Sequence, residues 1–148
     1  MRLVIDTSVM VGELLRKSGR ARLADDRLEL FIPDQMRGEL SVELPRRVRA
    51  LGSRRGINEA SQRSLLDACD AAISAAVVVI DEAVYSALEG EARRRTLRDP
   101  RDWPVVACAL TLGCGVWTND NDFLGTGVPT WTTESLRLWL ETQHSTSR

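Results

Sequence analysis

Short apolar runs alternate with longer segments of helical periodicity along this chain, and this alternation constrains its fold more than any other feature. Runs expected to be strands lie at residues 3–5, 28–32, 115–118 and 128–132, and a further run at 77–80 fits either a strand or a helix end. Strands that alternate with helices form a parallel sheet covered on both faces. We therefore expect an α/β fold, a three-layer sandwich around a central, mostly parallel sheet of four to five strands.

Helices are expected between these runs, where apolar residues recur three or four positions apart. The clearest pattern recurs every fourth residue from Met36 to Val48 and predicts a helix from residue 34 to about 51. Pro45 lies inside this helix and should kink or restart it, because proline has no amide hydrogen to donate. A flexible break is expected next, followed by further helices. The break is expected at 52–56, and the other helices at 6–16, 19–26, 57–74, 81–95, 102–112 and from 133 onward.

Chain length and apolar content bound the domain organisation and the compartment. With 148 residues, the chain suits one domain, expected at 1–142, with residues 143–148 as a disordered tail. It has no apolar run long enough to span a membrane, and an acid at position 6 interrupts any secretory signal. Its three cysteines share no zinc-ligand spacing, and we interpret them as reduced thiols, which are typical of a reducing compartment. We expect a cytoplasmic protein without membrane association.

The polar composition excludes several kinds of active site. There is one histidine, His144, near the end of the chain. This excludes a histidine-rich metal site and argues against a Ser-His-Asp or Cys-His nucleophile. The net charge of −1 argues neither for nor against nucleic-acid binding. A nuclease with an acidic metal site ringed by arginines can have a net charge close to zero.

Four acids follow predicted strands or begin predicted helices: Asp6, Glu39, Asp102 and Asp120. Ligands of parallel α/β proteins bind at the carboxyl ends of the strands, so these side chains are expected to meet at one edge of the sheet. Clustered carboxylates repel one another, and a hard divalent cation such as Mg²⁺ or Mn²⁺ relieves that repulsion. Such a site suits phosphodiester hydrolysis, because a bound cation lowers the pKa of water.

Each acid also has a structural interpretation. Asp6 and Asp102 could be only helix N-caps, Glu39 a solvated helix residue, and Asp120 with Asp122 a polar turn. Their joint placement favours the functional interpretation.

Four segments together resemble the PIN-domain nucleases, a family that includes VapC-type toxins. Leu3 to Ser8 resembles the family's first strand and aspartate, and Ile32-Pro33 followed by Glu39-Leu40 resembles its second acidic position. Asp99 to Leu110 resembles the third position, where an aspartate begins an apolar helix, and Val116 to Phe123 resembles the fourth. The similarity covers residues 1 to about 132. The Trp-Pro after Asp102 is closer to a bacterial and archaeal branch than to the commoner toxin pattern.

The resemblance assigns roles to these residues. It implies that Asp6, Asp102 and Asp120 ligate Mg²⁺ or Mn²⁺, and that Glu39 ligates the ion or positions water. Asp122 is a candidate fifth acid, and Asp99 competes with Asp102 for the third position. The candidates for contact with substrate are Thr118, Arg98, Arg101 and Trp103.

The expected function is that of a metal-dependent endoribonuclease, with the toxin of a toxin–antitoxin pair as one form of it. The expected partners are an RNA substrate, an antitoxin protein and, from the apolar helix surface around Trp139, a second copy of the chain. Two alternatives stay open: a non-catalytic PIN-like binding or assembly module, and a metal-dependent DNA nuclease or phosphatase.

Overall fold

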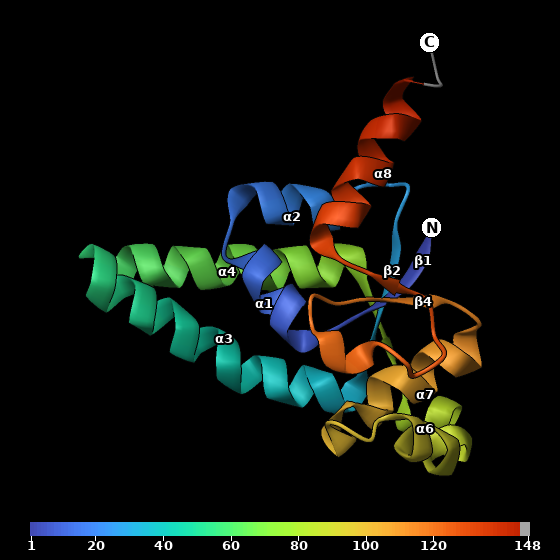
Figure 1. Ribbon diagram of the computed structural model, residues 1–148. Coiled ribbons are helices and arrows are strands. Elements are labelled where there is room, and N and C mark those ends of the chain that lie inside the picture. Colours follow the sequence, from blue (N-terminus) through green and yellow to red (C-terminus); the bar gives the residue numbers. More distant parts are fainter. Residues whose placement is uncertain (146–148) are drawn as a thin grey trace.

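A five-stranded, wholly parallel sheet forms the centre of the computed structural model, which describes residues 1–145 (Figure 1). Its strands lie in the order β3-β2-β1-β4-β5. Their bounds are β1 Arg2–Ile5, β2 Glu29–Pro33, β3 Val77–Ile80, β4 Gly115–Trp117 and β5 Thr130–Trp131. The expected α/β fold is confirmed, and the ambiguous run at 77–80 is an edge strand paired with β2.

Helices cover the two faces of this sheet. The connections from β1 to β2 and from β2 to β3 run outward and contain α1 (Thr7–Leu14), α2 (Lys17–Leu23), α3 (Asp34–Arg55) and α4 (Glu59–Ala76). The chain then crosses back to β4 through α5 (Glu82–Tyr85), α6 (Glu89–Arg95) and α7 (Trp103–Leu112). Because such crossovers are right-handed, this reversal places the third connection on the opposite face from the first two. Accordingly, α7 packs on β1, β2 and β4, whereas α3 packs on β2 and β3.

The hydrophobic core fills the space between β1, β4 and α7. Val4, Ile5 and Val116 have no exposed surface, and neither do Val105 and Val106 of α7. A strand covered on both faces needs apolar residues at successive positions, which explains the continuous apolar runs in the sequence. These packed strands give the residues that follow them a rigid support.

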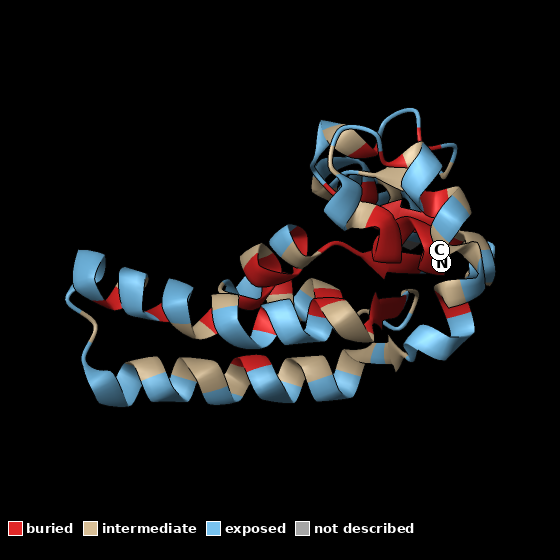
Figure 2. Cartoon of the chain, turned by 90° about the horizontal axis from the view of Figure 1, so that it is seen from below, coloured by how far each residue is buried: buried red, intermediate tan, exposed pale blue. Residues whose placement is uncertain are grey.

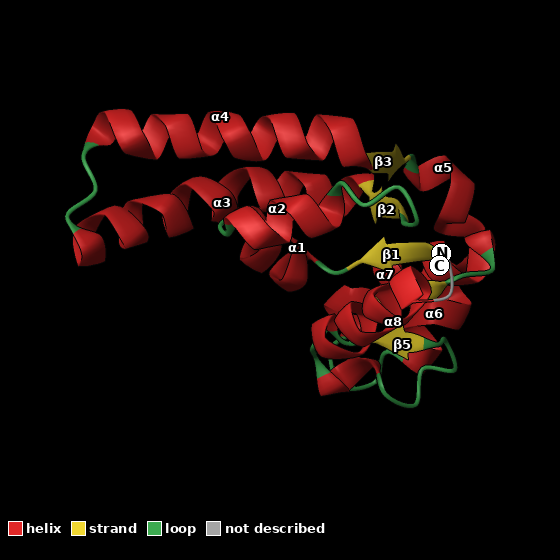
Figure 3. Cartoon of the chain, turned by 90° about the horizontal axis from the view of Figure 1, so that it is seen from above, coloured by secondary structure: helices red, strands yellow, loops and turns green. Residues whose placement is uncertain are grey.

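Two long helices, α3 and α4, run side by side and project from the sheet as an arm (Figures 2 and 3). The expected restart at Pro45 and the expected break at 52–56 are wrong, because α3 is one helix that continues to Arg55. A proline inside a helix costs about 3 kcal/mol. Burial of the apolar row from Met36 to Val48 offsets that penalty. Gly56 ends the helix with a φ of 65°, which favours glycine.

Several other boundaries differ from expectation, and two of these differences change the elements themselves. The helix expected at 81–95 is divided into α5, a short 3-10 segment at Ser86–Leu88, and α6. The last helix, α8 (Thr133–Ser145), extends beyond residue 142, so the start of the expected tail is helical, while residues 146–148 lie outside the described part of the chain. Trp139 of α8 packs edge-to-face on Trp131 with ring centroids 6.5 Å apart, so part of the apolar surface of α8 is used within the chain.

None of the helices in residues 1–145 combines the length and the apolar character needed to cross a membrane.

Candidate active site

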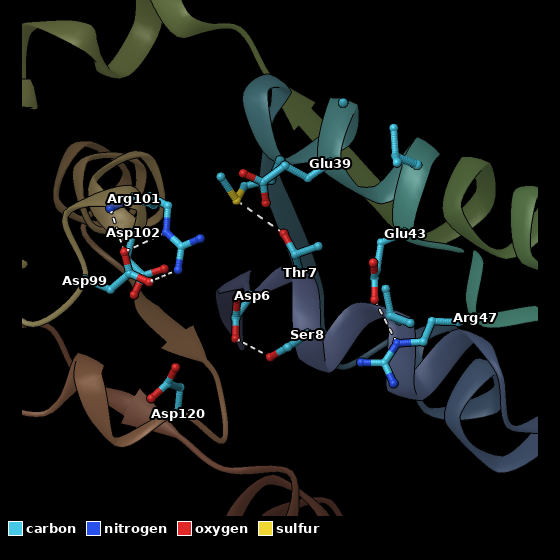
Figure 4. Close-up of a pocket in the computed structure, with 14 residues that line it drawn as sticks. Asp6, Thr7, Ser8, Glu39, Glu43, Arg47, Asp99, Arg101, Asp102 and Asp120 are labelled. Carbon is cyan, nitrogen blue, oxygen red and sulfur yellow. Dashed lines mark hydrogen bonds and ion pairs between the residues drawn. The ribbon is translucent and has the colours of Figure 1, made fainter. Parts of the chain in front are cut away.

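The strand order reverses between β1 and β4, and a cavity of about 880 Å³ lies at the carboxyl ends of these two strands. Parallel α/β proteins bind ligands at this kind of topological switch point. All four acids singled out in the sequence line the cavity: Asp6 after β1, Glu39 on α3, Asp102 before α7 and Asp120 after β4 (Figure 4). Residues separated by more than a hundred positions are thus brought to one opening.

Asp6 is held by two hydroxyl groups. It occupies the N-cap position of α1, but its side chain accepts no capping hydrogen bond. Instead, its Oδ2 accepts hydrogen bonds from the hydroxyls of Ser8 at 2.7 Å and Thr118 at 3.1 Å. Within residues 1–145, no donor bonds its Oδ1. The side chain is 9% exposed, so the simple capping interpretation fails and one oxygen is left for a ligand.

Thr118 links Asp6 to Asp120. Its hydroxyl donates to Asp6 and accepts from the backbone N–H of Asp120 at 3.0 Å, and its side chain is buried. Asp120 Oδ1 in turn accepts from the backbone N–H of Asp122 at 2.8 Å, so the polar-turn interpretation of Asp120 is correct in part. The turn fixes this carboxylate at the mouth of the cavity.

Asp102 has no partner to compensate its charge. It precedes α7 without a capping hydrogen bond, and its side chain makes no hydrogen bond or salt bridge with any residue of 1–145. Burial first, and then the carboxylates of Asp99, Asp6, Asp120 and Asp122, raise the pKa of Asp102 to about 7. A carboxylate in this environment is ready to bind a cation.

Asp99 and Arg101 neutralise each other beside Asp102. The Arg101 guanidinium donates to both oxygens of Asp99, at 3.0 and 2.7 Å, and Asp99 also accepts from the backbone N–H of Arg101. The side-chain hydrogen bond from Arg101 lowers the pKa of Asp99 to about 2. Of the two candidates for the third acidic position, Asp99 is therefore paired with an arginine, whereas the Asp102 carboxylate has no such partner.

Glu39 reaches the cavity from the second turn of α3. Burial raises the pKa of Glu39, Arg101 opposes that rise, and Asp6 and Asp99 add to it. Glu39 is exposed, as the solvated interpretation expects, but it also lines the cavity. It lies within the electrostatic field of the other acids and can assist in binding a cation.

The candidates for substrate contact fall in different places. Arg101 lines the cavity, and its side chain is 86% exposed. Arg98 lies 3.6 Å from Asp122 on the surface, and neither residue lines the cavity. Trp103 is 5% exposed, because Tyr85 packs on its ring at 5.9 Å and the Arg93 guanidinium lies 5.0 Å from it. The Trp103 ring therefore has no open face on which a base could stack.

Sequence reasoning missed three residues at this site: Ser8, Glu43 and Arg47. The serine follows Asp6 by two positions, a spacing that allows its hydroxyl to bond the aspartate. The other two line the cavity from α3, beyond Glu39 and at the same helical spacing of four residues. Their spacing from Glu39 within the predicted helix was the signal that could have identified them.

The side chains of this site fit a hard divalent cation, because the acids that line the cavity with Asp102 offer carboxylate oxygens as ligands. In residues 1–145, no three acidic, histidine or cysteine side chains already close around one point. Asp6, Asp102 and Asp120 therefore face one cavity without forming a finished coordination shell. A rotation of such side chains is a fast, low-barrier change.

Comparisons with known proteins agree with this fold. The family model of the PIN domain matches residues 4–141. The fold is similar to a crystal structure of VapBC2 from Rickettsia felis bound to a DNA fragment from their promoter. The TM-score is 0.58 at 17% sequence identity, covering 89% of this chain and 98% of that one. Identity at this level shows a shared fold alone. No curated protein matches the sequence.

Proposed function

The chain belongs to the PIN-domain family of nucleases, and from that membership we propose that it is a Mg²⁺- or Mn²⁺-dependent endoribonuclease. The proposed ligands of the cation are Asp6, Asp102 and Asp120, with Glu39 as a further ligand or as the residue that positions water. Asp122 contributes to the negative electrostatic potential of the site, because its charge helps to raise the pKa of Asp102.

The uncompensated carboxylate of Asp102 carries this proposal. Its neighbours in the cavity are other carboxylates, and its nearest arginine is engaged by Asp99. A purely structural aspartate would be capping α7 or paired with a base. A half-buried acid with neither role, in a cavity at the switch point, supports a cation site instead.

The residues of the site have different roles, which follow from their positions. When bound, the cation supplies Lewis-acid activation of water and stabilises charge on the phosphate. Ser8 and Thr118 fix the Asp6 carboxylate in one rotamer through Oδ2. The Thr118 hydroxyl also fixes the backbone at Asp120, so the two acids are oriented as a unit. Arg101, exposed at the rim, is placed to bind a phosphate oxygen once a substrate competes for it.

The proposed site predicts RNA cleavage that depends on both the metal and the acids. Purified protein should cleave a mixed-sequence single-stranded RNA in Mn²⁺ or Mg²⁺, and Asp6→Asn should abolish cleavage. Asparagine keeps the shape and the hydrogen-bonding partners of Asp6, so the variant should keep its fold by circular dichroism. Only the negative charge that attracts a hard cation is lost.

Four results would contradict the proposal. Cleavage that survives chelation of the metal, or an Asp6→Asn variant as active as the parent, would remove the metal site from the mechanism. Cleavage of single-stranded DNA in preference to RNA would assign the chain to the DNA nucleases instead. Cation binding without cleavage of either polymer would favour a PIN-like binding module.

Partner proteins are a separate part of the proposal. We propose an antitoxin partner on the similarity in fold to VapBC2, and a homodimer on the exposed apolar side chains, which include Leu138 at 50% exposure. Light scattering of the purified chain at high micromolar concentration should give the mass of a dimer, and a monomer there would contradict this. Isolation of a stable complex with the product of a neighbouring gene would test the antitoxin. The proposed compartment is the cytoplasm.

A further inference from the structure

The lining of the acidic cavity contains two arginines, Arg101 and Arg47. Figure 4 shows them on opposite sides of the site, with Asp6 and Ser8 between them. Arg101 extends from the segment before α7, whereas Arg47 extends from α3. A polyanionic strand that crosses the carboxylates would meet a positive charge on each side of them.

Arg47 is held in a fixed direction. Its Nε donates to Glu43 Oε1 at 2.8 Å, one helical turn away on α3. Within residues 1–145, neither terminal amino group of its guanidinium has a hydrogen-bond partner. The side chain is 59% exposed. A guanidinium oriented through Nε with its amino groups free can donate two hydrogen bonds to a phosphate.

The position of Arg47 along α3 sets which phosphate it can reach. Glu39, Glu43 and Arg47 form one row of residues four apart. Arg47 lies about 12 Å along the helix axis from Glu39, at 1.5 Å per residue. This separation is too long for the phosphate at the carboxylates and suits one further along the strand. Val42, which is 70% exposed, lies between Glu39 and Arg47 on the cavity wall and offers an apolar surface for a ribose or base.

We propose that Arg47 binds a phosphate of the RNA strand outside the scissile position, so that α3 guides the substrate away from the acids. The inference rests on the proposed ribonuclease function and adds the path of the strand. It makes Arg47 a substrate-positioning residue, and the continuity of α3 through Pro45 is what places it there.

The chain provides a matched control for this residue. Arg46 is also on α3, also contacts Glu43, at 3.5 Å, and is 72% exposed, but it does not line the cavity. Arg46→Gln and Arg47→Gln therefore remove the same charge from neighbouring positions. A general electrostatic effect on RNA binding would appear in both variants, whereas a phosphate contact would appear in Arg47→Gln alone.

Kinetics with RNA of two lengths should separate positioning from chemistry. For a long mixed-sequence RNA, Arg47→Gln should raise KM about fivefold, the effect of losing about 1 kcal/mol, and leave kcat unchanged. For a dinucleotide, which cannot reach Arg47, the parent and the variant should be equal. Arg46→Gln should behave as the parent with both substrates. An equal loss with both lengths, or equal behaviour of the two glutamine variants, would overturn the inference.

A double variant tests whether Arg47 acts only by neutralising Glu43. Removal of Arg47 leaves the Glu43 carboxylate paired only with Arg46, at 3.5 Å, and the less compensated charge could repel RNA. If Arg47 contacts phosphate, Glu43→Gln combined with Arg47→Gln should remain as weak as Arg47→Gln. Recovery of the parent's KM in the double variant would overturn the inference.

Binding measured without cleavage separates this inference from the proposed function. Fluorescence anisotropy with a labelled long RNA in chelator should show weaker binding for Arg47→Gln. The slope of log K against log salt should be smaller by about 0.7, the value for one phosphate contact in a single strand. Cleavage that persists with identical binding of both glutamine variants would refute the strand path and leave the nuclease proposal intact. If the parent protein cleaves no RNA but Arg47→Gln weakens RNA binding, the proposed path of the strand is supported and the proposed nuclease function is refuted.

Discussion

Asp102→Asn should stabilise the metal-free protein, although it removes a residue of the proposed active site. Burial and neighbouring carboxylates raise the pKa of Asp102 to about 7 from 3.8, a difference of roughly three pKa units. At 1.36 kcal/mol per unit, the ionised carboxylate would destabilise the fold by at most about 4 kcal/mol. Because the side chain is partly solvated, we expect about 2 kcal/mol. For a chain of this length, this corresponds to a rise in Tm of roughly 4–8 °C.

The pH dependence of this effect has a defined sign. The pKa of Asp102 is higher in the folded state than in the unfolded state, so the folded state binds the proton more tightly. The parent therefore loses stability as the pH rises from about 4 to about 7, whereas the variant does not. The difference between them should be near zero around pH 4 and reach its full value above pH 7.

Urea unfolding in chelator, measured at several pH values, tests this prediction. Asp99→Asn is the control with the opposite sign, because Arg101 lowers the pKa of Asp99 to about 2. Ionised Asp99 therefore stabilises the fold at pH values above its pKa in the unfolded state, and this contribution is lost as the pH falls towards 2. With Mn²⁺ at about 100 times its Kd, the parent should gain about 2.7 kcal/mol that Asp102→Asn does not gain. An Asp102→Asn variant no more stable than the parent above pH 7 in chelator would refute the account of this carboxylate.

Three further predictions concern the groups that support the site. The Glu13 carboxylate is fully buried between two arginines, so Glu13→Ala should destabilise the fold by about 3 kcal/mol, and a change below 1 kcal/mol by urea unfolding would contradict this. Tyr85 donates to Asp34 at 2.7 Å, so Tyr85→Phe should lower the unfolding free energy by about 1.5 kcal/mol by the same assay. Ser8→Ala removes one of two donors to Asp6 and should lower kcat about tenfold with little change in Tm, and an unchanged kcat would contradict its positioning role.

The sequence was sufficient to predict the sheet and the gathering of the acids, because both depend on local patterns and topology. A strand that ends at Asp6, and another that ends shortly before Asp120, must place these residues at one edge of a parallel sheet. The buried strands are continuous apolar runs, which are easily recognised. The order of the strands, and hence the switch point, depends on long-range pairing that the sequence does not display.

What the sequence did not predict depends on tertiary packing and on side-chain partners. Pro45 breaks an isolated helix, but in this protein the packed apolar row of α3 keeps the helix continuous. Trp103 adjoins an active-site acid in the sequence, yet α7 turns its ring into the core beside Tyr85. The sequence favoured Asp102 over Asp99, but only the geometry shows that Arg101 pairs with Asp99 and leaves the Asp102 carboxylate without a hydrogen bond.

The most direct test of the central claim is to locate the cation itself. Crystals grown with Mn²⁺ should show an anomalous scattering peak in the cavity, within coordination distance of carboxylate oxygens of Asp6, Asp102 and Asp120, and crystals of Asp102→Asn should lack it. A peak held by other residues, or a cavity that stays empty of Mn²⁺ when the ion is abundant, would contradict the assignment of these acids as a metal site.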